Sequence, residues 1–214
     1  MAYNILTIER EFGTGGYEIA MELSKLLQIP FYDQNKIRLI LNHEGNFTRA
    51  QQPSSTEKTN PMLYNLTTKM SDKEGCITPV DDETAKKEFG VICRLSEEGP
   101  CIILGRCANY ILRNRSDVYS VFIQGDVEKK KQRMQRMLGN ISADLVLQEM
   151  KHTDQTRSEY YQHFTGRRWD DPSDYNMILD EAKMTEEEMV LFIMNHMQKQ
   201  AMDYSEQRKH YINQ

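Results

Sequence analysis

The sequence predicts an α/β fold, an open parallel sheet of five strands with helices on both faces. Five short apolar segments alternate with longer segments whose apolar residues recur every three or four positions, the pattern of strands alternating with helices. Residues 101–104 are apolar at every position, which is typical of a strand covered on both faces. A glycine-rich turn follows the first apolar segment, and open α/β sheets bind ligands at such turns.

Composition favours one domain over residues 1–214 and limits its partners. Hydrophobic residues make up 39% of the chain and charged residues 28%, which suits a core with a polar surface. The formal net charge of -5 argues against nucleic-acid binding, which needs a basic face. No apolar stretch approaches the roughly 20 residues that span a bilayer, and the N-terminus shows no signal-peptide pattern. We expect a cytoplasmic protein without nucleic-acid or membrane partners, and leave its oligomeric state open.

The cysteines and histidines predict neither a disulfide framework nor a metal site. Cys76, Cys93, Cys101 and Cys107 form no C-x-x-C pair, and the five histidines are scattered. Cys101 and Cys107 flank an apolar run, where free cysteine usually serves as a small core residue.

The glycine-rich turn connects a strand at residues 5–8 to a helix whose apolar positions precede Pro30. Three glycines in four positions let the backbone bend tightly and expose N–H groups beside the positive end of that helix, an arrangement that suits phosphate. The candidate cofactor-binding residues are therefore Gly13, Thr14, Gly15, Gly16, Tyr17 and Glu18.

The turn has the shape of a P-loop without the lysine. The motif G-x-x-x-x-G-K-[ST] ends in Gly-Lys-Ser/Thr, whereas this chain has Gly15-Gly16-Tyr17 or Gly16-Tyr17-Glu18, according to register. Most of the question about function lies in that absence.

Asp33 ends the second predicted strand, residues 29–33. It is either a helix cap or, at the carboxyl end of a strand, a ligand contact. A helix is predicted over residues 36–41. The polar stretch 43–82, which contains several prolines, is predicted to be an inserted, mobile lobe of the same domain.

Arg106 directly follows the buried strand at residues 101–104. It is either an ion-pair partner or a phosphate ligand, because guanidinium donors match phosphate bidentately. The helix before this strand is predicted over residues 83–98, with its inward side formed by Ala85, Phe89, Ile92, Cys93 and Leu95.

A basic helix follows the fourth predicted strand, residues 118–123, with Asp126 as its cap. Lys129, Arg133 and Arg136 lie on one face of this helix. They form either a solvated basic surface or a set of cations that closes over a polyphosphate.

A long helix is predicted over residues 143–164, with Arg157 on its inward stripe and Asp154 three residues earlier. This pair is either a buried salt bridge or part of a charged pocket, because an unpaired buried arginine would be costly. Trp169 is interpreted as an anchor for the loop that follows. The fifth strand is predicted at residues 176–180.

Thr185 and Glu188 form a capping box that opens a last helix. Its inward residues are Met189, Val190, Ile193 and Met197.

Five stretches in this order resemble the cytidylate kinase-like family of bacterial proteins, relatives of the nucleoside monophosphate kinases. They are Ile8-Glu9-Arg10-Glu11-Phe12-Gly13-Thr14-Gly15-Gly16, Pro30-Phe31-Tyr32-Asp33, Leu104-Gly105-Arg106, Asp154-Gln155-Thr156-Arg157, and Tyr161 through Tyr175. The resemblance implies a P-loop kinase fold with strand order 2-3-1-4-5. It also implies a nucleotide-monophosphate lobe that includes residues 43–82 and a small arginine-bearing lid within residues 128–160.

The resemblance further implies that the chain moves the γ-phosphate of ATP to a nucleoside monophosphate such as CMP, with Mg²⁺. Nucleotides are then its partners. The catalytic candidates are Arg10, Arg106, Arg133 and Arg157, and the substrate-binding candidates are Asp33, Arg106, Asp154 and Arg157. No protein metal ligand is assigned; Thr14 or Glu18 is a candidate to help hold Mg²⁺, although neither position matches the usual Ser/Thr well.

Two positions depart from the family pattern. Tyr17 stands where relatives carry lysine or arginine, and Cys107 follows Arg106 where cytidylate kinases have an acid. Arg10, at the end of the first strand, is our hypothesis for the replacement cation. Two other functions stay open. One is a nucleotide- or anion-binding protein with little catalysis, acting as a sensor or partner-binding module, and the other is a kinase of a different metabolite.

Overall fold

The computed structural model describes residues 3–42, 81–139 and 141–197. Its strands are β1 (Ile5–Arg10), β2 (Phe31–Tyr32), β3 (Cys101–Leu104), β4 (Val118–Gln124) and β5 (Met177–Asp180). Its helices are α1 (Gly16–Leu27), α2 (Gln34–Asn42), α4 (Asp82–Glu98), α5 (Ala108–Ile111), α6 (Val127–Leu138) and α7 (Ala143–Thr165), with a short 3-10 helix η2 (Pro172–Asp174). A last helix covers residues 186–197 of the described chain.

The five strands form one parallel sheet in the order β2-β3-β1-β4-β5, which confirms the predicted strand order. β1 lies in the centre, and its Ile8 pairs with Leu104 of β3 and Val121 of β4. Parallel strands end at the same edge of a sheet. The glycine-rich turn after β1 therefore lies beside the turn after β3 and the start of α6.

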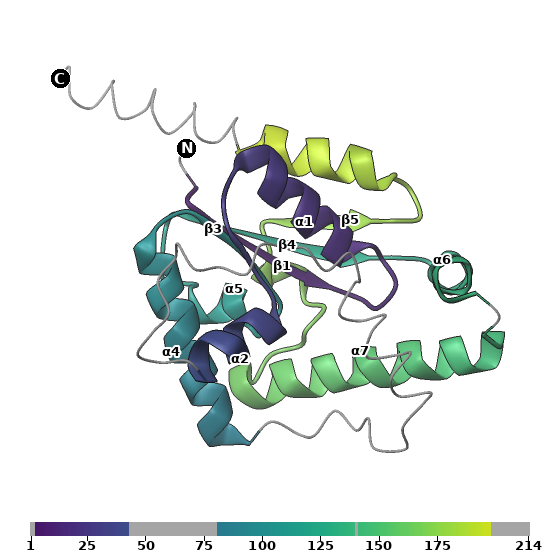
Figure 1. The fold of residues 1–214 in the computed structure, drawn as a ribbon, viewed down its shortest axis with the longest axis horizontal. Coiled ribbons are helices and arrows are strands. Elements are labelled where there is room, and N and C mark those ends of the chain that lie inside the picture. The colour runs from purple at the N-terminus through teal and green to yellow at the C-terminus, as the bar shows by residue number, and fades with distance from the viewer. Residues whose placement is uncertain (1–2, 43–80, 140, 198–214) are drawn as a thin grey trace.

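Helices cover both faces of the sheet (Figure 1). α1 and the helix at residues 186–197 lie on one face, and α2, α4, α5 and α7 lie on the other. This double cover explains why β3 is buried at every position and β1 at every position but its last.

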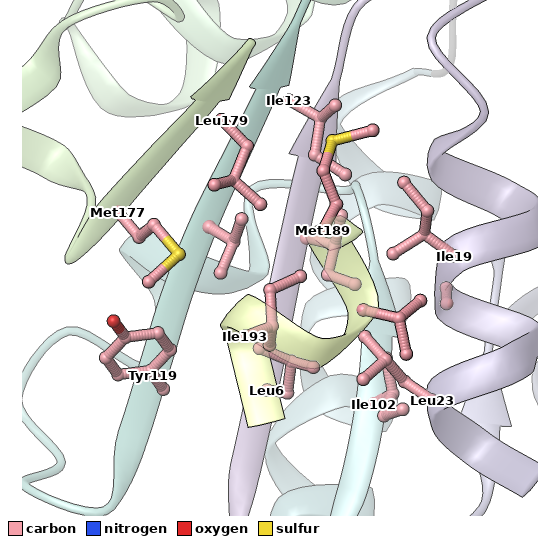
Figure 2. Packing of buried hydrophobic residues seen from close by; sticks show 14 of the residues in the cluster. Leu6, Ile19, Leu23, Ile102, Tyr119, Ile123, Met177, Leu179, Met189 and Ile193 are labelled. Carbon is pink, nitrogen blue, oxygen red and sulfur yellow. The ribbon is translucent and has the colours of Figure 1, made fainter. Parts of the chain in front are cut away.

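The larger core cluster fills the space between the sheet, α1 and the helix at residues 186–197. Figure 2 shows strand residues meeting helix residues there, among them Leu6, Ile102, Ile123, Ile19, Leu23, Met189 and Ile193. Residues of β1 and of the helix at residues 186–197, which are far apart in the sequence, therefore pack in the same cluster.

The predicted helix starts are confirmed by their hydrogen bonds. Asp126 caps α6 by accepting from the N–H groups of Glu128 and Lys129 at 2.9 and 3.1 Å. In the capping box, Thr185 N–H donates to Glu188 Oε2 at 2.8 Å and Glu188 N–H donates to Thr185 Oγ1 at 3.2 Å.

The inward side of α4 differs from the prediction. Cys93 is exposed, because the buried stripe runs through Val91, Ile92 and Leu95 and leaves it on the outer side. Glu88 is also buried on this stripe, although a pattern of apolar residues does not predict a buried glutamate. Cys101 and Cys107 are buried, as predicted.

Residues 43–80 of the predicted lobe lie outside the described residues, and so does Cys76. Residues 128–160 consist of most of α6, a short connection and most of α7. No helix in the described ranges combines the length and apolar character that crossing a membrane requires.

Candidate functional site

The glycine-rich turn runs from the end of β1 at Arg10 to the start of α1 at Gly16. Gly13 and Gly15 have φ angles of 85° and 76°, a left-handed conformation that favours glycine. The buried hydroxyl of Thr14 donates to the carbonyl of Glu11 at 2.9 Å and holds the turn closed.

This geometry fixes the register against the P-loop motif. The motif's second glycine precedes its lysine, and the lysine opens the helix. Gly15 caps α1, so Gly16 stands at the lysine position, Tyr17 at the Ser/Thr position and Arg10 at the first glycine. Arg10 therefore provides a side chain at the motif's first glycine position, and Gly16 has no side chain at the motif's lysine position.

The stem of Arg10 runs through the space that a lysine at position 16 would use. A Cβ atom built on Gly16 would lie 2.7 Å from Cγ of Arg10 and 2.9 Å from its Cβ. Further out, Nη1 of Arg10 lies 2.6 Å from where a Cβ of Gly105 would be. The side chain therefore spans from the first residue of α1 to the turn after β3.

The guanidinium of Arg10 has no hydrogen-bond or ion-pair partner within residues 3–42, 81–139 and 141–197. Burial lowers the pKa of Arg10, and the nearby carboxylates of Glu9, Asp33 and Asp154 act against this shift. A half-buried cation with no partner among the described residues, beside a glycine-rich turn, is suited to an incoming anion.

Arg157 of α7 lies against the same backbone. Its Nη1 donates to the carbonyl of Arg10 at 2.9 Å and lies 3.7 Å from Oδ1 of Asp154. Burial, and after it the neighbouring positive charge of Arg10, lower the pKa of Arg157 to about 9. The predicted pair with Asp154 is thus partly a salt bridge and partly one side of a two-arginine site.

Asp154 holds the turn in place. Its Oδ1 accepts from the N–H of Phe12 at 2.6 Å, and its Oδ2 lies 3.9 Å from Nζ of Lys130. Burial raises the pKa of this carboxyl, while Arg157, the Phe12 N–H and Lys130 lower it. The structure brings Asp154 to the turn, where its contacts are to the protein, so its predicted role in substrate binding stays a prediction.

Lys130 and Glu11 complete this contact and were not singled out from the sequence. Nζ of Lys130 lies 2.7 Å from Oε2 of Glu11, which also accepts from the N–H of Gly125 at 3.0 Å. Lys130 is only 4% exposed. A charged residue on a charged helix gives no sequence signal of burial, so only its partners reveal it.

Arg133 is the member of the basic face that reaches the turn. Its Cζ lies 3.2 Å from where a Cβ of Gly15 would be, and it pairs with Glu186 and, at 3.5 Å, with Glu18. Lys129 instead donates to the carbonyl of Ala182 at 2.6 Å. The basic face is therefore divided between the turn and the surface.

Arg106 is an ion-pair partner in this structure. Its Nη2 contacts Oε2 of the fully buried Glu88, and its guanidinium lies 4.0 Å from the ring centroid of Tyr160. Glu88 also accepts from Nε of Arg38 at 2.8 Å. Glu88 thus links two arginines that follow the ends of β2 and β3, the edge where an acceptor would lie.

Asp33 and Tyr17 are tied into the protein at that edge. Oδ1 of Asp33 accepts from the N–H of Lys36 at 2.9 Å, so Asp33 caps α2. The ring of Tyr17 packs against Phe31 with centroids 5.3 Å apart. Burial, then Asp33 and Glu18, raise the pKa of Tyr17 to about 12. The negative charge of Asp33 also stabilises the charge of Arg10.

The described residues do not offer the metal ligand of a P-loop. Tyr17 replaces the Ser/Thr, the Thr14 hydroxyl is buried and donates to Glu11, and Glu18 lies beside Arg133. Over the same ranges, no three or more His, Cys, Asp or Glu side chains group as a metal site would require. For Mg²⁺, which the resemblance implied, the described part of the chain therefore offers no fitting protein ligand.

Trp169 is buried, as expected of an anchor. Its ring packs edge-on against Phe122, and its Nε1 donates to Oε2 of Glu9 at 3.1 Å. Glu9, inside β1, is a second buried carboxylate that the sequence patterns did not single out.

The model of the cytidylate kinase-like family matches residues 5–183 of this chain. The match contains the turn and every arginine discussed above. No match to the curated proteins was found.

Two solved structures share the fold. An uncharacterized protein from Eubacterium ventriosum is 24% identical with a TM-score of 0.69, and the match covers 91% of this chain and 98% of that one. A gluconokinase from Sinorhizobium meliloti is 15% identical with a TM-score of 0.56, with 95% and 97% covered. At such identities the likeness shows the fold alone, that of the P-loop kinases.

Proposed function

Because this chain belongs to the cytidylate kinase-like family, we propose that it transfers the γ-phosphoryl group of ATP to a nucleoside monophosphate, with CMP as the first acceptor to test. The observation that carries the proposal is Arg10. Its guanidinium has no partner among the described residues and lies over Gly105 in the turn after β3, and its stem fills the space of the missing lysine beside Gly16.

Phosphoryl transfer asks the protein mainly to position groups and to stabilise the charge on the transferring phosphate. The turn provides backbone N–H groups at the start of α1, a helix of 12 residues whose N-terminus attracts anions. Arg10 and Arg157 place two cations beside it. Together they supply the charges that a P-loop lysine and a second cation would supply.

The acceptor is proposed to bind at the ends of β2 and β3. Arg106 and Arg38 lie there with Glu88 between them, and Asp33 lies at the start of α2. An acceptor phosphate would be attracted by the two arginines, and Asp33 would accept a hydroxyl or amino donor. This arrangement supports a monophosphate ester over an uncharged acceptor.

A second function, nucleotide binding with little turnover, is favoured by the pairing of two candidate cations. Arg106 is bound to Glu88 and Arg133 to Glu186, so each must change partners to meet a phosphate. A kinase for another small metabolite would use the same turn with a different acceptor.

The test is turnover of ATP·Mg²⁺ with a panel of nucleoside monophosphates, with thermal-shift binding measured in parallel. We expect phosphorylation of at least one acceptor and a loss of about 10²- to 10³-fold in kcat for Arg10→Ala, the cost of removing one preorganised donor. A thermal shift without turnover would favour the second function. An unaffected Arg10→Ala would refute the role of this side chain.

A further inference from the structure

Glu9 is a buried carboxylate at the centre of the sheet that the proposed chemistry does not use. It is 4% exposed, and both of its oxygens are engaged. Oε1 accepts from the N–H of Cys107 at 3.2 Å, and Oε2 accepts from Nε1 of Trp169 at 3.1 Å. Each donor comes from a different loop, one after β3 and one after α7.

The turn that donates to Glu9 is strained. Gly105, Arg106 and Cys107 have φ angles of 79°, 62° and 57°. A left-handed conformation at a residue other than glycine costs about 1–3 kcal/mol and persists only where surrounding contacts impose it. The conformation presents the Cys107 N–H to Glu9 while the Arg106 side chain pairs with Glu88.

The carboxylate of Glu9 and the guanidinium of Arg10 approach the same point. A Cβ built on Gly105 would lie 2.6 Å from Nη1 of Arg10 and 3.9 Å from Oε2 of Glu9. The two side chains leave opposite faces of β1 and converge over this glycine. Glu9 is also the largest source of negative charge acting on Arg10.

We propose that Glu9 is a positioning residue for Arg10. Held by the Trp169 indole and the Cys107 amide, its negative charge attracts the Arg10 guanidinium, without a direct ion pair, and keeps it over Gly105, where an incoming phosphate meets it. The inference rests on the proposed function, because it takes Arg10 as the phosphate ligand. It gives Trp169 a second role, since this side chain fixes Glu9 and is the only tryptophan of the chain.

The sign of one substitution separates this proposal from simple electrostatics. Glu9→Gln removes a negative charge near an anion site, and the relief of Coulomb repulsion alone would tighten anion binding. If Glu9 positions Arg10, the same substitution weakens binding.

The first experiment titrates the full-length protein with pyrophosphate, by calorimetry and by Trp169 fluorescence. We expect Glu9→Gln to weaken binding about tenfold, equivalent to about 1.4 kcal/mol, and to abolish the emission response seen in the wild type. Trp169→Phe should weaken binding in calorimetry, and the double variant should lose no more than Glu9→Gln alone, since the two residues act as one unit. Glu22→Gln, a surface carboxylate paired with Lys25, is the matched charge control and should bind normally. Equal or tighter binding by Glu9→Gln, or additive losses, would overturn the proposal.

The second experiment needs no ligand. Phenylglyoxal modifies arginine, and peptide mass spectrometry gives the rate at each position in the intact protein. Arg10 should react several-fold faster in Glu9→Gln than in the wild type, while the exposed Arg168 reacts at the same rate in both. An unchanged rate at Arg10 would refute the positioning role. If the wild type neither binds pyrophosphate nor turns over nucleotides, the proposed function fails. The modification rate of Arg10 still tests whether Glu9 positions Arg10.

Discussion

At the scale of single residues, positions 10 and 16 have exchanged roles relative to the P-loop motif. Gly16 does not have a positive φ, so its backbone accepts a side chain. What excludes a side chain there is Arg10, whose Cγ would lie 2.7 Å from a Cβ at position 16. The glycine is therefore explained by its neighbour across the turn and not by its own conformation.

This exchange predicts that the two positions depend on each other. Gly16→Lys alone should impair nucleotide binding, because the new side chain collides with Arg10. Arg10→Gly alone should impair it by removing the cation, at a cost of about 3–4 kcal/mol in the transition state. The double variant Arg10→Gly with Gly16→Lys restores the motif order and should recover activity above either single variant.

Turnover and ATP affinity of the four proteins check this prediction. Melting temperatures establish that each variant is folded. If the double variant is as poor as the worse single variant, the two side chains do not share one space.

At the scale of elements, α6 and α7 act as a clamp on the turn. A Cβ on Gly13 would lie 3.3 Å from Cβ of Lys130 and from Cγ of Met134, so α6 packs directly on the glycine backbone. Asp154 of α7 binds the Phe12 N–H from the other side. Lys130 joins both helices to the turn through Glu11 and Asp154.

Removing the ammonium of Lys130 should release this clamp. Lys130→Met leaves the carboxylates of Glu11 and Asp154 facing each other and should cost about 2–4 kcal/mol, somewhat below the range for a broken buried pair because both acids are partly exposed. Urea unfolding measures this loss. Hydrogen exchange at the Phe12 amide should accelerate, because its acceptor is no longer held.

Lys131→Met is the matched control, since Lys131 pairs with Glu128 inside α6. It should leave the exchange rate at Phe12 unchanged. Equal effects of the two substitutions would assign the loss to α6 itself and not to the clamp.

At the scale of the whole molecule, the larger core cluster joins one face of the sheet to α1 and the helix at residues 186–197. Ile193 is fully buried there, while Leu191, two residues away on the same helix, is 58% exposed. Ile193→Ala should reduce the free energy of unfolding by roughly 2–5 kcal/mol, the range for large core truncations. Leu191→Ala should change it by less than about 0.5 kcal/mol. Similar losses in urea unfolding would mean that the helix at residues 186–197 contributes little to this core.

The fold was predictable because its signals are local. Apolar periodicity, the glycine-rich turn and the caps at Asp126 and Thr185 are each readable within a few residues, and together they limit the topology. The prediction that Cys93 lies on the inward side of its helix was wrong, because a cysteine fits an inward or an outward position equally well.

The buried charges could not be predicted in the same way. Glu9, Glu88 and Lys130 lie in sequence contexts that favour solvent, and each is stable inside only because of partners far along the chain. Arg106, Arg133 and Arg157 were singled out by their positions along the predicted strands and helices, and the resemblance made them catalytic candidates. That the described residues pair with Arg106 and Arg133 but leave the Arg10 guanidinium without a partner became apparent only from the structure.

The contact between Arg157 and the carbonyl of Arg10 has a consequence for biosynthesis. It joins residues 147 positions apart, and the bonds from Phe12 to Asp154 and from Trp169 to Glu9 span 142 and 160. A chain that emerges from the ribosome N-terminus first therefore displays the glycine-rich turn long before α7 can reach it. Nucleotide could stabilise the native protein only after synthesis has passed that helix, so the earliest part of the sequence to appear is among the last to become a binding site.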